Sequence, residues 1–243
     1  MLKELICSVH EAGLSNIVYY SFHVLGLLLA LLVALNDAGH LKIKLWKAFV
    51  AVLVVYPIIY ELRYAVRWFE RLFYECDGAN IVKAFIFLPF VIWPVAKLLG
   101  VKQCKINQLF AVIPCIGQGI SHIGCIFPGC CEGYAASWGI YNYGLNCLCI
   151  PVQLFEAATA LLIGLYLELR FRKNNWHDDK KALPIMFVLF GASRFLLEFC
   201  RNNDKIFLHI SNPALHCLLM AIVGIVWLVL LKRSEKKAVG VRG

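Results

Sequence analysis

The stretch Ile17–Leu35 reads IVYYSFHVLGLLLALLVAL, and it contains no Asp, Glu, Lys or Arg. A helix rises about 1.5 Å per residue, so a run of this length crosses the roughly 30 Å hydrocarbon core of a bilayer. Its apolar residues are continuous and do not alternate, which favours a helix over the strand of a closed barrel. The stretch therefore predicts a transmembrane helix.

Similar apolar blocks recur along the 243-residue chain, which is 61% hydrophobic and only 16% charged. A soluble domain is usually about half apolar and about a quarter charged. We expect an all-α, polytopic membrane protein with about seven transmembrane helices, in which residues 1–243 form a single transmembrane domain. The predicted spans are residues 17–35, 48–65, 81–99, 106–127, 151–169, 183–199 and 212–231. Pro89 and Pro94 predict a kink in the third span.

Lys and Arg gather in four segments, at residues 39–47, 97–105, 170–181 and 232–242. Such residues concentrate on the cytoplasmic side of a membrane, so we expect the C-terminus in the cytoplasm and the N-terminus outside. Residues 121–151 contain no Lys or Arg and are expected to face outward. Some basic residues would also lie outside, among acidic residues that can pair with them: Arg63, Arg67, Arg71 and Lys83 near Glu61, Glu70, Glu75 and Asp77.

The net charge of +9 follows the same pattern. In a soluble protein such a charge would suggest a nucleic-acid partner. Here the basic residues lie at the ends of apolar blocks, where they act as membrane-edge anchors. We therefore expect no nucleic-acid binding.

Eleven cysteines are spread along the chain, and three of them lie in a central segment with a histidine: His122, Cys125, Cys130 and Cys131. The segment lacks a paired C-x-x-C, so we expect no metal site. Four cysteines lie in the segment that is expected to face outward: Cys130, Cys131, Cys147 and Cys149. These four residues leave a membrane thiol–disulfide oxidoreductase open as an alternative function.

Two pairs of polar residues interrupt the predicted spans. Ionisable groups in such spans are costly and usually face a cavity or a partner. Arg194 and Glu198 are four residues apart, so they share a helix face and form either a buried ion pair or the lining of a polar pocket. Gln153 and Glu156 also share a face, near the outer boundary, where interfacial residues often extend into water.

Taken in order, three blocks resemble the prolipoprotein diacylglyceryl transferase family. They are residues 123–133 (IGCIFPGCCEG), 151–156 (PVQLFE) and 194–201 (RFLLEFCR). The first is similar to the family's Arg-Ile-Gly signature. The second is similar to its His-Pro-x-Gln-Leu-Tyr-Glu block, and the third to its Arg-Phe-x-x-Glu-Phe-x-Arg block.

The chain also departs from the family pattern. His122 stands in place of the signature Arg, Cys125 in place of the Asn, and Cys130 at the position of a carboxylate, with Glu132 close by. Ile150 replaces the His of the second block, and residues 85–91 contain no His-Gly-Gly motif. The Tyr-Gly of the first span is Leu25-Gly26.

The resemblance implies transfer of a diacylglyceryl group from phosphatidylglycerol to the lipobox cysteine of a prolipoprotein. It implies a multi-pass protein of the bacterial cytoplasmic (inner) membrane, whose partners are lipid and a prolipoprotein signal peptide, and which needs no cofactor. A relative that binds lipid without catalysis, or that uses another substrate, is an alternative because several motif positions are substituted.

The resemblance also implies which residues form the site. Arg194 would stabilise the departing phosphate, Glu198 would orient Arg194 or take a proton, and His122 would act as a cation or as a general base. The implied substrate-binding residues are Gly124, Cys125, Glu132, Gln153, Glu156 and Arg63.

Overall fold

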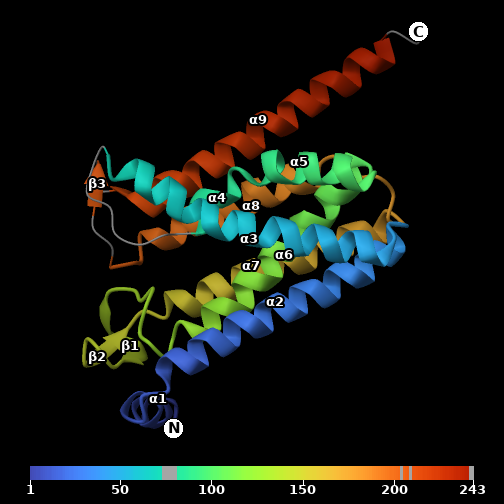
Figure 1. Ribbon diagram of the computed structural model, residues 1–243. Coiled ribbons are helices and arrows are strands. Elements are labelled where there is room, and N and C mark those ends of the chain that lie inside the picture. The colour runs from blue at the N-terminus through green and yellow to red at the C-terminus, as the bar shows by residue number, and fades with distance from the viewer. Residues whose placement is uncertain (73–80, 203–204, 208–209, 241–243) are drawn as a thin grey trace.

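The computed structural model describes residues 1–72, 81–202, 205–207 and 210–240, with side chains described outside 203–210 and 238–243. The described residues are mostly helical (Figure 1). The helices are α1 (Leu2–Glu11), α2 (Ser15–His40), α3 (Leu45–Glu70), α4 (Ile81–Phe85), α5 (Leu88–Leu99), α6 (Gln103–Gly124), α7 (Val152–Lys173), α8 (Ala182–Glu198) and α9 (Asn212–Gly240).

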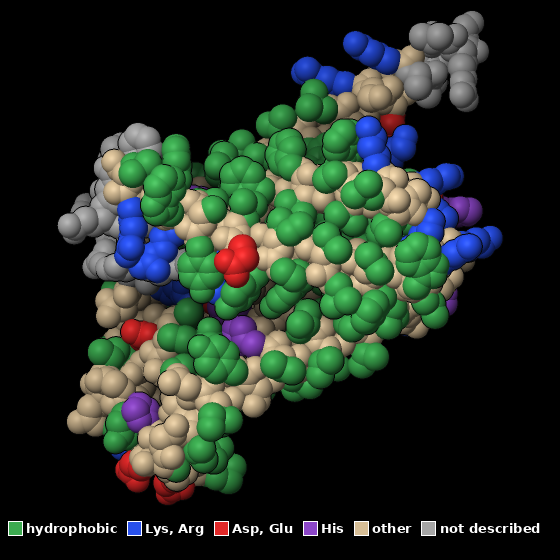
Figure 2. Space-filling model, in the orientation of Figure 1, with side chains coloured by type: hydrophobic (Ala, Val, Ile, Leu, Met, Phe, Trp, Pro, Cys, Tyr) green, Lys and Arg blue, Asp and Glu red, His purple; other side chains and the backbone are tan. Residues whose placement is uncertain are grey.

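Four of these helices, α2, α3, α7 and α9, are long and apolar enough to cross a membrane. The longer helices run side by side along one direction of the molecule (Figure 1). On the face shown in Figure 2, hydrophobic side chains cover much of the surface between the two ends. An exposed apolar surface of this extent marks contact with a membrane. The chain is therefore a multi-pass membrane protein.

The predicted third span, residues 81–99, is not one helix. It is divided into α4 and α5, which are separated at Ile86 and Phe87. Pro89 lies in the first turn of α5 and has no N–H to donate to the carbonyl of Phe85, where a continuous helix would require that bond. The predicted kink is thus a complete break.

The basic segments meet at one end of the bundle. Lys105 Nζ donates to the carbonyl of Leu41 over 2.6 Å, and Lys47 donates to the carbonyl of Leu99. His40 stacks on Trp176 with ring centroids 4.7 Å apart. The segments that join α2 to α3, α5 to α6 and α7 to α8 therefore form one surface, as the Lys and Arg pattern predicts for a common side.

The opposite end carries the elements that the all-α prediction missed. Strands β1 (Ala135–Asn142) and β2 (Cys147–Cys149) form an antiparallel pair, and β3 (Lys205–Phe207) pairs with β4 (Ile210–Ser211). The loop after α6 is tied to the chain after α8, because Gly133 forms a β-bridge with Arg201. This bridge brings two motif blocks together across the bundle.

Helix α6 is central and packs closely on α2. A Cβ at Gly26 would lie 2.8 Å from the carbonyl oxygen of Gly117, and a Cβ at Gly124 would lie 2.7 Å from Cβ of Phe22. Small residues permit such close helix crossings in membranes. Gly124, expected to bind substrate, is therefore a packing residue at this crossing.

Candidate active site

A cavity of about 310 Å³ lies among α2, α3, α6 and α8. Its walls are largely apolar, with residues such as Leu27, Val52 and Phe110. Polar and thiol side chains line it from α6, from the loop after α6, from α8 and from the chain after α8, and they include His122, Cys125, Cys131, Arg194 and Arg201. An apolar cavity with a few convergent polar groups is typical of a ligand site.

Glu156 of α7 is the central charge of this polar group. It is 1% exposed, and its Oε2 lies 2.6 Å from Arg194 Nη1, 3.4 Å from Arg201 Nη2 and 3.1 Å from His122 Nδ1. A buried carboxylate needs such partners, because an isolated charge is very costly away from water. Of the two interpretations of Glu156, an interfacial residue extending into water and a residue of the polar site, the burial excludes the first.

The contacts of His122 define its tautomer. Arg194 Nη1 lies 2.9 Å from His122 Nε2, and a guanidinium can only donate. Nε2 must therefore accept, so the ring proton is on Nδ1, which donates to Glu156 over 3.1 Å. His122 is a neutral imidazole in this arrangement, which argues against its expected role as a substitute cation.

Glu198 binds a different arginine from the one expected. Its Oε1 is 3.0 Å from Arg201 Nη1 but 3.8 Å from Arg194 Nη2. Ser211 donates to Oε2 of Glu198 over 3.2 Å. The expected Arg194–Glu198 contact is present but weak, and Glu156 is the stronger partner of Arg194.

Arg201 was not among the expected site residues, although it is the last residue of the third block. Two carboxylates, Glu156 and Glu198, bind it, and it is 4% exposed. The sequence spacing could have identified it, because Arg201 comes three residues after Glu198 and residues at this spacing can share a helix face. Two arginines and two carboxylates thus form a charge-balanced cluster.

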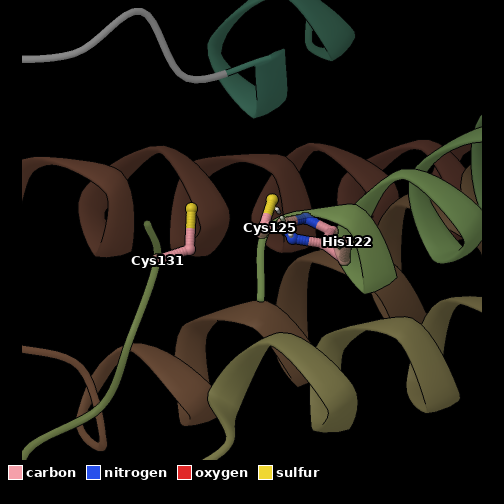
Figure 3. A group of neighbouring side chains, drawn as sticks. All are labelled: His122, Cys125 and Cys131. Atoms are coloured by element: carbon pink, nitrogen blue, oxygen red, sulfur yellow. Dashed lines mark hydrogen bonds between the residues drawn. The ribbon is translucent and has the colours of Figure 1, made fainter. Parts of the chain in front are cut away.

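Two thiols lie beside His122, as Figure 3 shows. Ligand atoms of His122, Cys125 and Cys131 all lie within 4.8 Å of one another. Cys131 holds a left-handed backbone conformation with φ of 62°, which is uncommon for a non-glycine residue. Hydrogen bonds from the Cys125 and Cys130 thiols, with the positive charge of Arg201, lower the pKa of Cys131 well below that of a free thiol.

The remaining expected residues lie around this cluster. Gln153 donates to the carbonyl of Cys130 over 2.9 Å and so holds the thiol-bearing loop against α7. Arg63 lines the cavity from α3, with its guanidinium 3.7 Å from the ring centroid of Tyr60 and 4.5 Å from that of Tyr64. Glu132 is partly buried in the loop, where its backbone carbonyl accepts from the N–H of Asn202.

The other cysteine pair lies in the β1–β2 hairpin. Cys147 Sγ and Cys149 Sγ are 3.8 Å apart, and the ten cysteines that the structure describes, Cys76 excluded, are free thiols. Burial and the neighbouring Cys147 raise the pKa of Cys149 to about 11. Since the thiolate is the reactive form, this keeps Cys149 unreactive near neutral pH.

Comparison of the sequence with known proteins identifies its family. Residues 9–230 match the prolipoprotein diacylglyceryl transferase family. The chain is 26% identical over 124 residues to phosphatidylglycerol–prolipoprotein diacylglyceryl transferase 2 of Clostridium perfringens. This aligned region covers 44% of this chain and 47% of that protein. The chain is 25% identical over 133 residues to the phosphatidylglycerol–prolipoprotein diacylglyceryl transferase of Dehalococcoides mccartyi, covering 51% of this chain and 50% of that protein. The chain thus spans about half the length of these curated relatives. Because the family match covers most of the chain, the protein belongs to the prolipoprotein diacylglyceryl transferase family.

Proposed function

We propose that this protein transfers a diacylglyceryl group from phosphatidylglycerol to the lipobox cysteine of a prolipoprotein, in the bacterial cytoplasmic membrane. The observation that carries the proposal is the cavity with apolar walls and two buried arginines, Arg194 and Arg201. Acyl chains suit the apolar walls, and guanidinium groups suit a phosphate, which they bind in planar, two-point contacts. Family membership supports the same reaction class.

The arginines would act on the phosphate as it leaves. The acceptor sulfur attacks the glycerol carbon that carries the phosphate, the carbon–oxygen bond breaks, and the electron pair goes to the phosphate oxygen. Arg194 and Arg201 would stabilise the added charge on that oxygen. Glu156 and Glu198 hold both guanidinium groups in place before substrate binds, so little reorganisation would be needed.

The acceptor thiol must become a thiolate, because the thiolate is the nucleophile. We assign this activation to the side of the cavity formed by His122, Cys125 and Cys131. A neutral His122 suits a role in thiol activation better than a role as a cation. Arg63 would contact lipid that enters between α2 and α3. The support for this role is a second cavity, which Arg63 lines together with Tyr19 and Tyr56.

The proposal includes the topology of about seven spans, with the N-terminus outside and the C-terminus inside. The meeting of the basic segments at one end, with β1 and β2 at the other, supports it. Reporter fusions after residue 145 and after residue 237 test it: an enzyme active only in the cytoplasm should be active at the second point and inactive at the first. The reverse pattern would overturn the orientation.

Complementation tests the activity. The chain is expressed in bacteria depleted of their own diacylglyceryl transferase, and prolipoprotein processing is followed on gels. We expect rescue by the wild type and a fall of about 10²–10³ in the rate of transfer for Arg194→Ala, the loss typical of removing one charge-stabilising donor. Arg233→Ala, an exposed residue of α9, is the matched control and should rescue fully.

Two outcomes would count against the proposal. Equal rescue by Arg194→Ala and Arg233→Ala would remove Arg194 from the mechanism. No rescue by wild-type protein that is present in the membrane would favour a relative that has another substrate or no catalytic activity.

A further inference from the structure

The side chains of His122, Cys125 and Cys131 form a compact group that the phosphate chemistry does not use. It includes two thiols and an imidazole, and it lines the cavity beside the arginine cluster. Thiolates and imidazoles together are the ligand set that zinc prefers, whereas Mg²⁺ and Ca²⁺ prefer oxygen ligands. The chemistry of the group therefore points to a thiophilic metal ion.

The spacing of the three ligand atoms fits such an ion. Tetrahedral zinc, with bonds of about 2.3 Å to sulfur and about 2.0–2.1 Å to nitrogen, places its ligand atoms roughly 3.5–3.8 Å apart. Here Cys125 Sγ lies 3.9 Å from His122 Nδ1, and the three ligand atoms lie within 4.8 Å of one another. A contraction of roughly 1.0–1.3 Å in the longest separation would thus complete the coordination.

The surrounding charges also fit. The two arginines and two carboxylates of the cluster, Arg194, Arg201, Glu156 and Glu198, sum to zero. A Zn²⁺ ion that displaces the protons of two thiols adds two positive and two negative charges, so the sum stays zero. The site can therefore change between metal-free and metal-bound forms without a net charge being added to the membrane interior.

We propose that His122, Cys125 and Cys131 bind a zinc ion whose fourth coordination position is open to the cavity. Three protein ligands with an open position are the pattern of catalytic zinc, whereas structural zinc has four. Coordination through His122 Nδ1 moves the ring proton to Nε2. Nε2–H and Arg194 Nη1 would then both be donors at 2.9 Å, so Arg194 would turn away from the ring while keeping its contact with Glu156. The N–H group that Nε2 had accepted would be freed.

The open coordination position of the zinc ion would account for activation of the acceptor thiol. This step rests on the proposed transferase function. The acceptor cysteine would bind as the fourth ligand, since a thiol that coordinates zinc is deprotonated. Its proton would pass to the carboxylate of Glu156, which no longer accepts from His122 Nδ1 once that atom binds the metal. The sulfur of the acceptor cysteine then forms the new carbon–sulfur bond, while the carbon–oxygen bond to the phosphate breaks. The resulting thioether is a weaker ligand than a thiolate and leaves the ion, which is neither oxidised nor reduced.

Metal content and cobalt spectroscopy test the site without any measurement of turnover. The full chain is purified in detergent without chelator, and bound metals are measured by mass spectrometry. We expect about one zinc ion per chain. The metal-free protein, given Co²⁺, should show thiolate-to-cobalt charge-transfer absorption. Cys125→Ser and Cys131→Ser should each lose both signals.

The matched controls are Cys147→Ser and Cys149→Ser, which change the neighbouring thiol pair at the same end of the molecule and should keep both signals. Should a variant fail to fold, the wild type still decides, because bound zinc raises the melting temperature and removal with EDTA lowers it. Zinc-free wild type that gains no cobalt absorption would overturn the inference. So would metal retained by Cys131→Ser or lost from Cys147→Ser.

The results separate this inference from the transferase proposal. A protein that rescues prolipoprotein processing but binds no zinc retains the transferase function and excludes the metal. A protein that binds zinc through these residues but never transfers a lipid group retains the metal site and excludes the transferase.

Discussion

Replacing Glu156 by Gln tests whether the buried charge cluster stabilises the bundle. Glu156 is 1% exposed and lies 2.6 Å from Arg194, 3.1 Å from His122 and 3.4 Å from Arg201. Glutamine has nearly the same shape, but it removes the negative charge that both guanidinium groups share. Removing one partner of a buried ion pair costs about 3–5 kcal/mol, because the other charge stays buried without compensation. We expect a loss of stability in this range.

An exposed ion pair provides the matched control. Lys181 and Glu235 lie 2.9 Å apart, with side chains 38% and 52% exposed. Solvent screens such a pair, whose contribution is about 0–1 kcal/mol. Glu235→Gln makes the same chemical change as Glu156→Gln, so the two variants differ only in where the charge is lost.

Thermal unfolding in detergent, followed by tryptophan fluorescence, measures both variants. For a chain of this size, 1 kcal/mol shifts the melting temperature by about 2–4 °C. We therefore expect a decrease of roughly 6–20 °C for Glu156→Gln and of at most about 4 °C for Glu235→Gln. Equal shifts would refute the reasoning, since they would show that Glu156 is as well solvated as a surface residue.

Two further predictions concern the helix contacts. Gly26→Val should destabilise the protein by about 1–3 kcal/mol, because the added Cβ would lie 2.8 Å from the carbonyl oxygen of Gly117. Gly39→Val is the control, since a Cβ there meets no atom within 4 Å. Equal melting temperatures for the two variants would contradict the close packing of α2 on α6. Lys83→Met should cost about 3–5 kcal/mol, because Lys83 is 1% exposed and its ion pair with Glu70 joins α4 to α3; an unchanged melting temperature would show that this pair is not structural.

The helices were predictable because their determinants are local. A long apolar run must satisfy its backbone bonds internally in a membrane, so Ile17–Leu35 predicted α2 within a few residues of its observed ends. The break before α5 was harder to predict. Proline within a membrane helix produces either a bend or a break, and the choice depends on neighbouring helices that satisfy the freed backbone groups. Lys83 pairs with Glu70, as expected, whereas Arg63 lies against the rings of Tyr60 and Tyr64. Glu75 and Asp77 lie outside the described residues.

The sequence predicted only some of the contacts within the candidate site. Spacing along one helix identified Arg194 and Glu198, which do lie within 3.8 Å of each other. The nearer carboxylate, Glu156, comes from another helix, and spacing within one helix cannot show which helix lies opposite. The grouping of His122 with Cys125 and Cys131 was not predicted, for a related reason. Rules for C-x-x-C pairs assume ligands that are close in sequence on one loop, whereas His122 and Cys131 meet because the chain turns back after α6.

Two of the substitutions relative to the family pattern, His122 and Cys130, compensate each other in charge. The resemblance places His122 at a position held by an Arg and Cys130 at a position held by a carboxylate, so one positive and one negative group are lost together. The cluster that remains contains two arginines and two carboxylates. A buried site cannot lose one sign of charge alone, because the excess would be left without a partner. Under the two proposals made above, the arginines would keep the phosphate-binding side, while the neighbouring thiols and imidazole of Cys125, Cys131 and His122 would supply the zinc ligands. We expect this pattern if the group that deprotonates the acceptor thiol differs from that of the family, while the arginines that stabilise the departing phosphate are the same.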